Sequence, residues 1–395
     1  MADGVRPHDP GAPPWPHDPG AALGPGTGGW LGRSLPRRED ARLVTGRARF
    51  LGDLWRPGVL HCVFVRSTEA HGRLGPASLG AVREAPGVVA AFAAADLGLA
   101  DIPGSTGRGP QAPAMRRPVL PRDRVRYVGE PVAAVVARTR EAGEDAAERL
   151  DLAVEPEEVV AGAGTALTDR VLLFPEAGTN VVARTTLPER APGPGPGAWP
   201  VRVVVETCNQ RLAPAPIEPL GILAEPDAGG VTVHCGHQAP HRLRDQLARL
   251  LRLDPASVRV VVPEVGGAFG LKGMLFPEYL VVVAAALRLG RPVLWSEARH
   301  DRFLVGTHGR GQRHRVVLGG DERGRIRAAR VEILADLGAY PHNGSAVPLF
   351  TRYLAGGPYA IDDLQVTTTM VVTNRAPTGS YRGAGRPEAA YAIER

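Results

Sequence analysis

Residues 263–273 read Pro263-Glu264-Val265-Gly266-Gly267-Ala268-Phe269-Gly270-Leu271-Lys272-Gly273, a glycine-rich stretch between two apolar segments. The valine-rich residues 258–262 before it predict a buried strand, and residues 276–289 after it have the unbroken apolar content of a buried helix. A glycine-rich turn between a strand and a helix presents backbone amides that can bind an anion. Glycine also permits positive φ and lets a ligand approach the main chain closely.

This stretch matches neither of the two common phosphate-binding fingerprints. It lacks the Gly-x-Gly-x-x-Gly of a dinucleotide-binding turn and the Gly-Lys-Ser/Thr ending of a P-loop. Taken alone, it is equally consistent with a plain tight turn in an α/β domain. Lys272 stands out within it, because it is the only lysine in a chain with 47 Lys+Arg.

The composition indicates a globular protein of two or three domains. The chain has 395 residues, of which 44% are hydrophobic, and no stretch approaches the ~20 apolar residues of a membrane span. The net charge is +6, but the arginines are dispersed among acidic residues and aromatics are only 5%, which argues against nucleic-acid binding. Cys62, Cys208 and Cys235 form no Cys-x-x-Cys pair, which favours a reducing, cytoplasmic location.

A cluster of histidines at residues 234–241 has a spacing that could bind zinc. His234, Cys235 and His237 follow a predicted strand, whereas His241 begins a predicted helix. These side chains should therefore diverge, and we predict no metal site there.

The chain divides into four parts by composition. Residues 1–32 are rich in Pro and Gly and are expected to form a disordered tail without a secretory signal. Residues 33–165 show strand patterns at 58–67, 88–92 and 124–137, then a helix at 139–150. Residues 166–200 are expected to form a linker, because the proline-rich part at 184–200 should not pair as a strand. Residues 201–395 form the last part, with a strand at 201–206, a helix from His241, a strand at 292–296 and a hairpin at 316–334.

Several of these segments resemble, in the same order, the molybdenum-cofactor-binding large subunit of the xanthine dehydrogenase and aldehyde oxidase family. The stretch at 263–273 resembles the family's Gly-Gly-x-Phe-Gly-Gly-Lys loop, and residues 376–390 resemble its Tyr/Phe-Arg-Gly-x-Gly-x-Pro segment. Residues 45–50, 60–71 and 126–133 resemble its hammerhead domain. The resemblance implies a mixed α+β fold in which an α/β hammerhead domain is followed by the first part of a molybdopterin-binding domain, incomplete at the C-terminus.

The resemblance also implies a set of site residues. The cofactor-binding residues would be Gly266, Gly267, Ala268, Phe269, Gly270, Gln238, Arg382 and Gly383. Arg382 would orient the substrate or stabilise negative charge, and Gln210 is the candidate for the glutamine that contacts the metal's apical ligand. Leu271 replaces a family glycine and is expected to crowd the cofactor. Gly383 and Ala384 stand where carbon monoxide dehydrogenases have a cysteine, which argues against that substrate.

The activity implied is that of a molybdenum hydroxylase oxidising an aldehyde or an N-heterocycle, with water as the oxygen source. The cofactor would be molybdenum-molybdopterin in the cytosine dinucleotide form, with iron–sulfur and FAD groups on partner subunits. The family's catalytic glutamate belongs to a later segment, so we expect the general base to be absent here, with the missing half either carried by a second chain or lost from a truncated gene. Glu130, Glu218, Glu264 and Glu278 have other places in the family pattern and are not expected to replace it.

Two other interpretations stay open. The chain could be a non-catalytic relic or assembly subunit that keeps the fold, or an ordinary nucleotide-binding α/β protein. The basic run at 308–315 could grip a phosphate, although the hairpin that follows favours a solvated strand edge.

Overall fold

The computed structural model describes residues 34, 36–104, 113–188 and 193–395, which fall into two units, Met1–Ala48 and Arg49–Arg395. The first unit contains helix α1 (Asp40–Val44), before which Arg37 forms an ion pair with Asp40. The tail expected at residues 1–32 lies outside the described residues, as do residues 189–192 of the expected linker.

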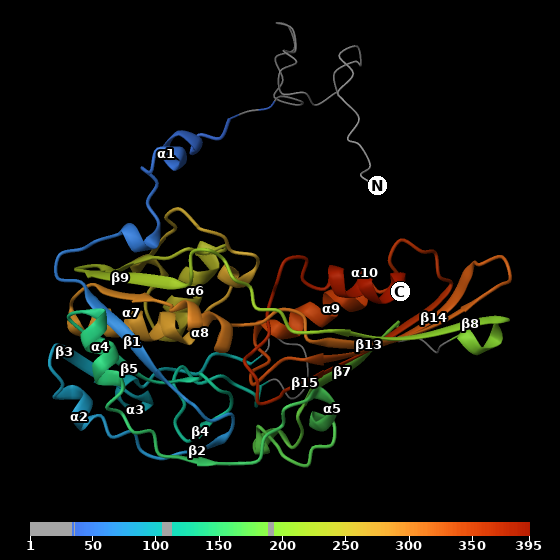
Figure 1. Ribbon diagram of the computed structural model, residues 1–395, viewed down its shortest axis with the longest axis horizontal. Coiled ribbons are helices and arrows are strands. Elements are labelled where there is room, and N and C mark those ends of the chain that lie inside the picture. The colour runs from blue at the N-terminus through green and yellow to red at the C-terminus, as the bar shows by residue number, and fades with distance from the viewer. Residues whose placement is uncertain (1–33, 35, 105–112, 189–192) are drawn as a thin grey trace, which may run out of the picture. The chain divides into compact units, whose positions relative to one another are not determined.

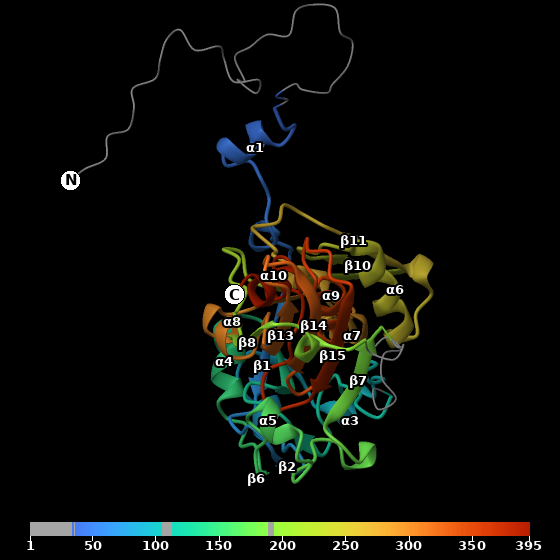
Figure 2. The same cartoon turned by 90° about the vertical axis from the view of Figure 1, so that its right-hand side faces the viewer.

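The second unit contains three sheets (Figures 1 and 2). The largest has seven strands in the order β11 (Val258–Val261), β10 (Gly230–His234), β9 (Gly221–Asp227), β12 (Val293–Ser296), β1 (Leu60–Arg66), β5 (Pro131–Ala137) and β3 (Val88–Phe92). The five-stranded sheet has the order β7 (Val181–Leu187), β15 (Asp363–Val371), β14 (Ile326–Asp336), β13 (Gln312–Gly320) and β8 (Val201–Asn209). A small sheet joins β4 (Arg124–Val125), β2 (Gly72–Leu74) and β6 (Val154–Pro156).

The helices of this unit are mostly short. They are α2 (Gly80–Arg83), α3 (Ala94–Leu97), α4 (Arg140–Ala147), α5 (Ala163–Ala166), α6 (Pro240–Leu251), α7 (Pro277–Leu289), α8 (Arg299–Leu304), α9 (Ala346–Tyr353) and α10 (Arg386–Glu394). None of the helices in the described part of the chain is both long and apolar enough to cross a membrane.

The predicted strand, loop and helix around residue 266 are confirmed as β11, the glycine-rich loop and α7. Every residue of α7 from Pro277 to Ala286 is buried, so this helix forms the centre of the main hydrophobic core. Helix α6 packs beside it through Leu243, Leu247 and Leu250, as its leucine periodicity predicted. Burying ten consecutive residues fixes α7, and it therefore fixes the loop that precedes it.

The expectation that residues 184–200 cannot pair as a strand is wrong for the first four of them. Strand β7 runs to Leu187 and pairs with β15, with Arg184 opposite Thr369 and Leu187 opposite Val366. The β-branched Thr185 and Thr186 favour this strand, and the proline-rich sequence begins only after it.

The seven-stranded sheet combines strands from both of the predicted domains. Strand β12 pairs in parallel with β1, with Leu60 opposite Val293, and it pairs with β9 on its other side. The domain boundaries at 33–165 and 201–395 therefore stay predictions, and the two ranges do not each form a sheet of their own.

The basic run at 308–315 does not form a strand edge, so that interpretation is wrong. Strand β13 pairs with β14 on one side and with β8 on the other, which makes it a central strand. Within β13 the side chains alternate, with Gln312 and His314 buried and Arg313 and Arg315 exposed, so these arginines are solvated although the strand is not at an edge.

Candidate functional site

Two glycine-rich segments that are more than 100 residues apart in sequence meet at one place. The Arg382 amide, in the segment before α10, donates a hydrogen bond to the Phe269 carbonyl in the glycine-rich loop, at 2.9 Å. The two backbones are so close that a Cβ at Gly270 would lie 2.8 Å from the Ser380 carbonyl oxygen. The structure thus brings together the two segments from which most of the predicted site residues come.

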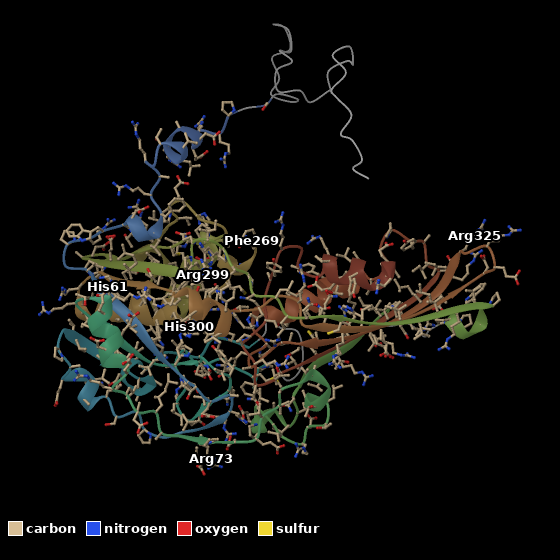
Figure 3. The ribbon with its side chains drawn as sticks, viewed as in Figure 1. His61, Arg73, Phe269, Arg299, His300 and Arg325 are labelled. Carbon is tan, nitrogen blue, oxygen red and sulfur yellow. The ribbon has the colours of Figure 1, made fainter. Side chains whose placement is uncertain are left out.

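Both segments hold non-glycine residues in the left-handed region. Phe269, labelled in Figure 3, has φ of 53° and keeps 42% of its surface exposed. Ala384 has φ of 41°. A bulky residue in this region costs conformational energy, and such strain concentrates where a ligand is bound. Because Phe269 is exposed, a ligand can reach this part of the loop.

The loop keeps several backbone donors free. The Gly266 amide donates to Glu218 at 2.9 Å, and the Gly270 amide donates to Gln238 Oε1 at 3.0 Å. Between them, the amides of Gly267, Ala268 and Phe269 have no acceptor among the residues the structure describes. Consecutive free amides suit an anionic ligand, so these residues fit the phosphate and oxygen atoms of a pterin cofactor.

An ion pair fixes the far side of the loop. Lys272 Nζ lies 2.6 Å from Glu218 Oε2, and only 1% of the lysine side chain is exposed. Glu218 Oε1 also accepts the Leu51 amide at 3.3 Å. Burial lowers the pKa of Lys272, and the Glu218 carboxylate opposes that shift. Glu218 therefore holds the loop in place and is not available as a free base.

The two candidate glutamines differ in position. Gln238 makes two hydrogen bonds to the loop. Its side-chain Oε1 accepts from the Gly270 amide, and its backbone amide donates to the Lys272 carbonyl at 2.8 Å. Gln210 is exposed and makes no hydrogen bond within the described part of the chain. The structure thus brings Gln238 to the loop, whereas Gln210 has no hydrogen bond to it among the described residues.

Arg382 has a free side chain on a fixed backbone. Its guanidinium is exposed and has no ion pair or hydrogen bond with any described residue. Its carbonyl accepts from Arg310 Nη2 at 2.8 Å, while Arg310 Nη1 donates to Glu388 Oε1 at 3.1 Å. Glu388 in turn accepts the Gly385 amide at 2.8 Å, which caps α10. This arrangement presents an uncommitted cation beside the loop.

Sequence analysis did not identify Arg310 and Glu388 as supports of the site. Glu388 lies in the segment 376–390 and Arg310 in the basic run at 308–315, but neither pattern joins the two residues. The available signal was an acid directly after a glycine-rich turn. The structure buries this acid, which then requires a partner, but the sequence does not reveal which arginine supplies it.

Leu271 does not crowd the open side of the loop as expected. Its side chain is fully buried in the main core with Leu275 and Phe276. The substitution therefore adds apolar contacts below the loop and leaves its exposed surface unchanged.

The histidines at 234–237 have separate partners. His234 Nε2 lies 3.0 Å from Glu225, and His237 Nε2 lies 3.3 Å from the Met274 carbonyl. Among the residues that the structure describes, no three His, Cys, Asp or Glu side chains are grouped so that they could hold a metal ion.

The other acidic candidates are also occupied by protein groups. Glu130 is buried and accepts from the Tyr340 hydroxyl at 2.5 Å and from the Arg126 amide at 2.7 Å. Glu278 pairs with Arg66 at 3.0 Å. Each of these carboxylates therefore has a structural role.

Comparisons with known proteins agree with this geometry. Residues 198–395 match the model of the molybdopterin cofactor-binding domain, and residues 45–158 match that of the aldehyde oxidase and xanthine dehydrogenase a/b hammerhead domain. The 6-hydroxypseudooxynicotine dehydrogenase complex subunit gamma of Paenarthrobacter nicotinovorans is 36% identical over 384 residues, covering 93% of this chain and 47% of that protein. The crystal structure of quinoline 2-oxidoreductase from Pseudomonas putida 86 superposes with a TM-score of 0.84 at 30% identity, covering 91% of this chain and 48% of that one.

The chain spans about half the length of these relatives. The nicotinate dehydrogenase large molybdopterin subunit of Eubacterium barkeri differs in this respect. It is 27% identical over 369 residues, and the match covers 92% of this chain and 84% of that subunit. A polypeptide of similar length thus occurs as a molybdopterin subunit.

Proposed function

Since the chain belongs to the xanthine dehydrogenase and aldehyde oxidase family of molybdopterin-binding large subunits, we propose that it is part of a molybdenum hydroxylase. The enzyme would oxidise an aldehyde or an N-heterocycle and take the oxygen atom from water. The observation that carries this proposal is the row of free amides at Gly267, Ala268 and Phe269 beside the uncommitted Arg382.

These residues fit the cofactor through backbone donors and need no metal ligand of their own. The amides of Gly267 to Phe269 would hold its anionic groups, and Gln238 would keep the loop in the binding conformation through the Gly270 amide. When bound, the molybdenum cofactor supplies oxygen transfer and two-electron oxidation. Arg382 would orient the substrate and stabilise negative charge that develops on it.

The preferred substrate class is the N-heterocycle. Two similar proteins carry names that indicate such compounds, a nicotinate dehydrogenase subunit and a quinoline oxidoreductase. Gly383 and Ala384 stand where a cysteine would favour carbon monoxide, so carbon monoxide is not proposed. Oxidation of R–H by water to R–OH releases two protons and two electrons, which must leave the site.

The electrons would leave through partners. This chain has only Cys62, Cys208 and Cys235, of which two are buried, so it offers no cluster-binding pattern. Iron–sulfur and FAD subunits would therefore accept the electrons, and the assembly would reside in the cytoplasm. The cofactor would be the cytosine dinucleotide form, whose additional phosphate suits a loop of free amides.

The general base would come from polypeptide that completes the cofactor domain. Glu130, Glu218 and Glu278 are engaged by protein donors. Under this proposal the described residues bind the cofactor and orient the substrate, whereas a carboxylate outside them acts as the general base.

Metal analysis of the protein, co-expressed with its companion subunits, tests the proposal. We expect about one molybdenum per chain and oxidation of a heterocycle such as nicotinate. A stable assembly without molybdenum would instead support a non-catalytic relic, and tight binding of a free nucleotide without molybdenum would support an ordinary nucleotide-binding protein.

A further inference from the structure

Strand β8 has a neighbouring strand on one side only. Among the described strands it pairs with β13 alone, so it lies at the edge of the five-stranded sheet (Figure 1). Natural proteins protect an edge strand with lysine, proline, a bulge or a covering segment, because its free amides and carbonyls can pair with another chain. Strand β8 is nine residues long, contains no lysine or proline, and keeps a regular register with β13. It therefore has the features of a strand that pairs with a partner.

The side chains of β8 are more exposed than those at the opposite edge of the sheet. Val201, Val203 and Val204 are 45%, 46% and 43% exposed. In β7, the strand at the opposite edge, Arg184 alone is exposed. β-branched side chains are stabilised by packing against a neighbouring strand, and a further strand beside β8 would bury these three valines.

The charges of β8 are placed to complement a second copy of the same strand. Arg202 and Glu206 lie four residues apart on the same face of the strand, with Val204 midway between them. If two β8 strands pair antiparallel with Val204 opposite Val204, each Arg202 faces the Glu206 of the other copy. Val203 then faces Val205 on the other face of the sheet. The five central positions thus pair valine with valine and positive with negative charge, and such cross-strand pairs stabilise a sheet.

The geometry of an antiparallel pair restricts the possible registers. Opposite residues direct their backbone groups either both towards the partner strand or both away from it, so the two-fold axis passes through a residue and not between two. Moving the axis to Val203 or Val205 sets both charges of β8 opposite uncharged residues. Moving it to Glu206 sets two carboxylates opposite each other, which destabilises the pair. Charge complementarity therefore selects Val204 as the centre.

The neighbouring strands continue the same charge pattern. Glu206 lies opposite Arg315 of β13, with 3.6 Å between the carboxylate and Nε, and Arg315 lies opposite the exposed Glu332 of β14. Arg202 forms no ion pair with any residue that the structure describes. Arg202 of a second copy would therefore complete a row in which positive and negative side chains alternate across four strands.

We propose that the chain forms a homodimer in which the β8 strands of two copies pair antiparallel about Val204 and join the two five-stranded sheets into one. The occupant of the edge is a second copy, because a strand of the same sequence supplies Glu206 opposite Arg202 and Arg202 opposite Glu206 at once. This inference does not depend on the proposed function, since it uses no residue of the glycine-rich loop or of the turn at Arg382.

Analytical ultracentrifugation of the full chain tests the proposal, and we expect a dimer. Arg202→Glu and Glu206→Arg should each weaken dimerisation at least tenfold, because each sets two pairs of like charges opposite one another. An equimolar mixture of the two variants should recover the dimer, because in the mixed pair both positions again face an opposite charge. Arg184→Glu, on the opposite edge strand β7, is the matched control and should change the dimerisation constant less than twofold.

Cysteine cross-linking tests the register. Because Cys208 is exposed, the measurement uses a Cys208→Ser background. In that background Val204→Cys should form a disulfide between copies under mild oxidation, since each thiol faces its counterpart across the two-fold axis. Val203→Cys should remain unlinked, because it faces Val205. Cross-linking at Val203 and not at Val204 would overturn the proposed pairing.

Three results in the ultracentrifuge would also overturn the proposal. They are a monomeric unmodified chain, a dimer that neither charge variant weakens, and a mixture of the two variants that stays monomeric. Recovery of the dimer in the mixture would show in addition that both variants are folded. A dimer that holds no molybdenum would contradict the proposed function and leave this inference intact.

Discussion

Lys272 Nζ and Glu218 Oε2 lie 2.6 Å apart, and the same carboxylate oxygen accepts the Gly266 amide at 2.9 Å. The single lysine of the chain is therefore tied to the first glycine of the loop through one carboxylate. Since Lys272 is buried and 16% of the Glu218 side chain is exposed, removing either partner leaves a poorly solvated charge.

Lys272→Met should destabilise the fold by about 3 kcal/mol, because an unpaired carboxylate remains beside the core. Urea unfolding followed by circular dichroism measures this change. The double variant Lys272→Met/Glu218→Gln should recover at least half of the loss, since the amide is uncharged and can still accept from Gly266. If the double variant is no more stable than the single one, charge is not the cause.

Gly270→Ala should separate the two glycine-rich segments. Gly270 has φ of 95°, and the added Cβ would lie 2.8 Å from the Ser380 carbonyl oxygen, which belongs to the other segment. We expect a loss of about 2 kcal/mol in unfolding free energy and at least a tenfold fall in bound molybdenum.

Gly290→Ala is the control for this substitution. Gly290 also has positive φ, at 61°, but a Cβ there meets nothing within 4 Å. It should cost about 1 kcal/mol and leave the molybdenum content unchanged. Equal metal loss in both variants would show that backbone strain, and not the contact with Ser380, controls cofactor binding.

The strand, loop and helix at 258–289 could be predicted because their signals are local. Valines, glycines and a long apolar run each specify their own element, and the burial of α7 follows from its sequence. The meeting of Phe269 with Arg382 was expected only from the family resemblance, since no local pattern joins residues more than 100 positions apart.

The features that the sequence did not predict have long-range causes. Strand β13 is central because it pairs with β8, which lies more than 100 residues earlier. The alternation of buried and exposed side chains along β13 does not reveal whether it has one neighbouring strand or two. Gln238 and Gln210 both lie in short irregular segments, and only the tertiary contact with Gly270 distinguishes them. The pairing of Arg310 with Glu388 likewise depends on the packing of α10 and could not be chosen among the many arginines of the chain.

Acid should destabilise the protein through buried histidines. Burial lowers the pKa of His314 to about 4, where its ring contacts Thr207 and Gln312, whereas an unfolded histidine has a pKa near 6.5. Between these two values the unfolded chain takes up a proton that the folded chain refuses, so stability falls as pH drops from about 6.5 towards 4.

The expected loss from His314 is about 3 kcal/mol over that interval. Chemical denaturation at pH 7, 5.5 and 4.5 measures it. His314→Gln should show a shallower decrease, because glutamine does not titrate, even if it is less stable at pH 7. A decrease as steep as that of the unmodified protein would mean that other groups dominate.

Arg382→Gln should impair turnover more than assembly. The Arg382 guanidinium makes no hydrogen bond or ion pair with the described residues, whereas its backbone is fixed through the Phe269 carbonyl and Arg310. The substitution should therefore remove the free charge and leave the turn intact. In the assembled enzyme we expect about a 100-fold lower kcat/KM for a heterocycle, with unchanged molybdenum content and thermal midpoint. Arg202→Gln, which alters another exposed arginine at the start of strand β8, should leave kcat/KM within twofold. A molybdenum content that falls in parallel with activity would show that Arg382 binds the cofactor and does not act on the substrate.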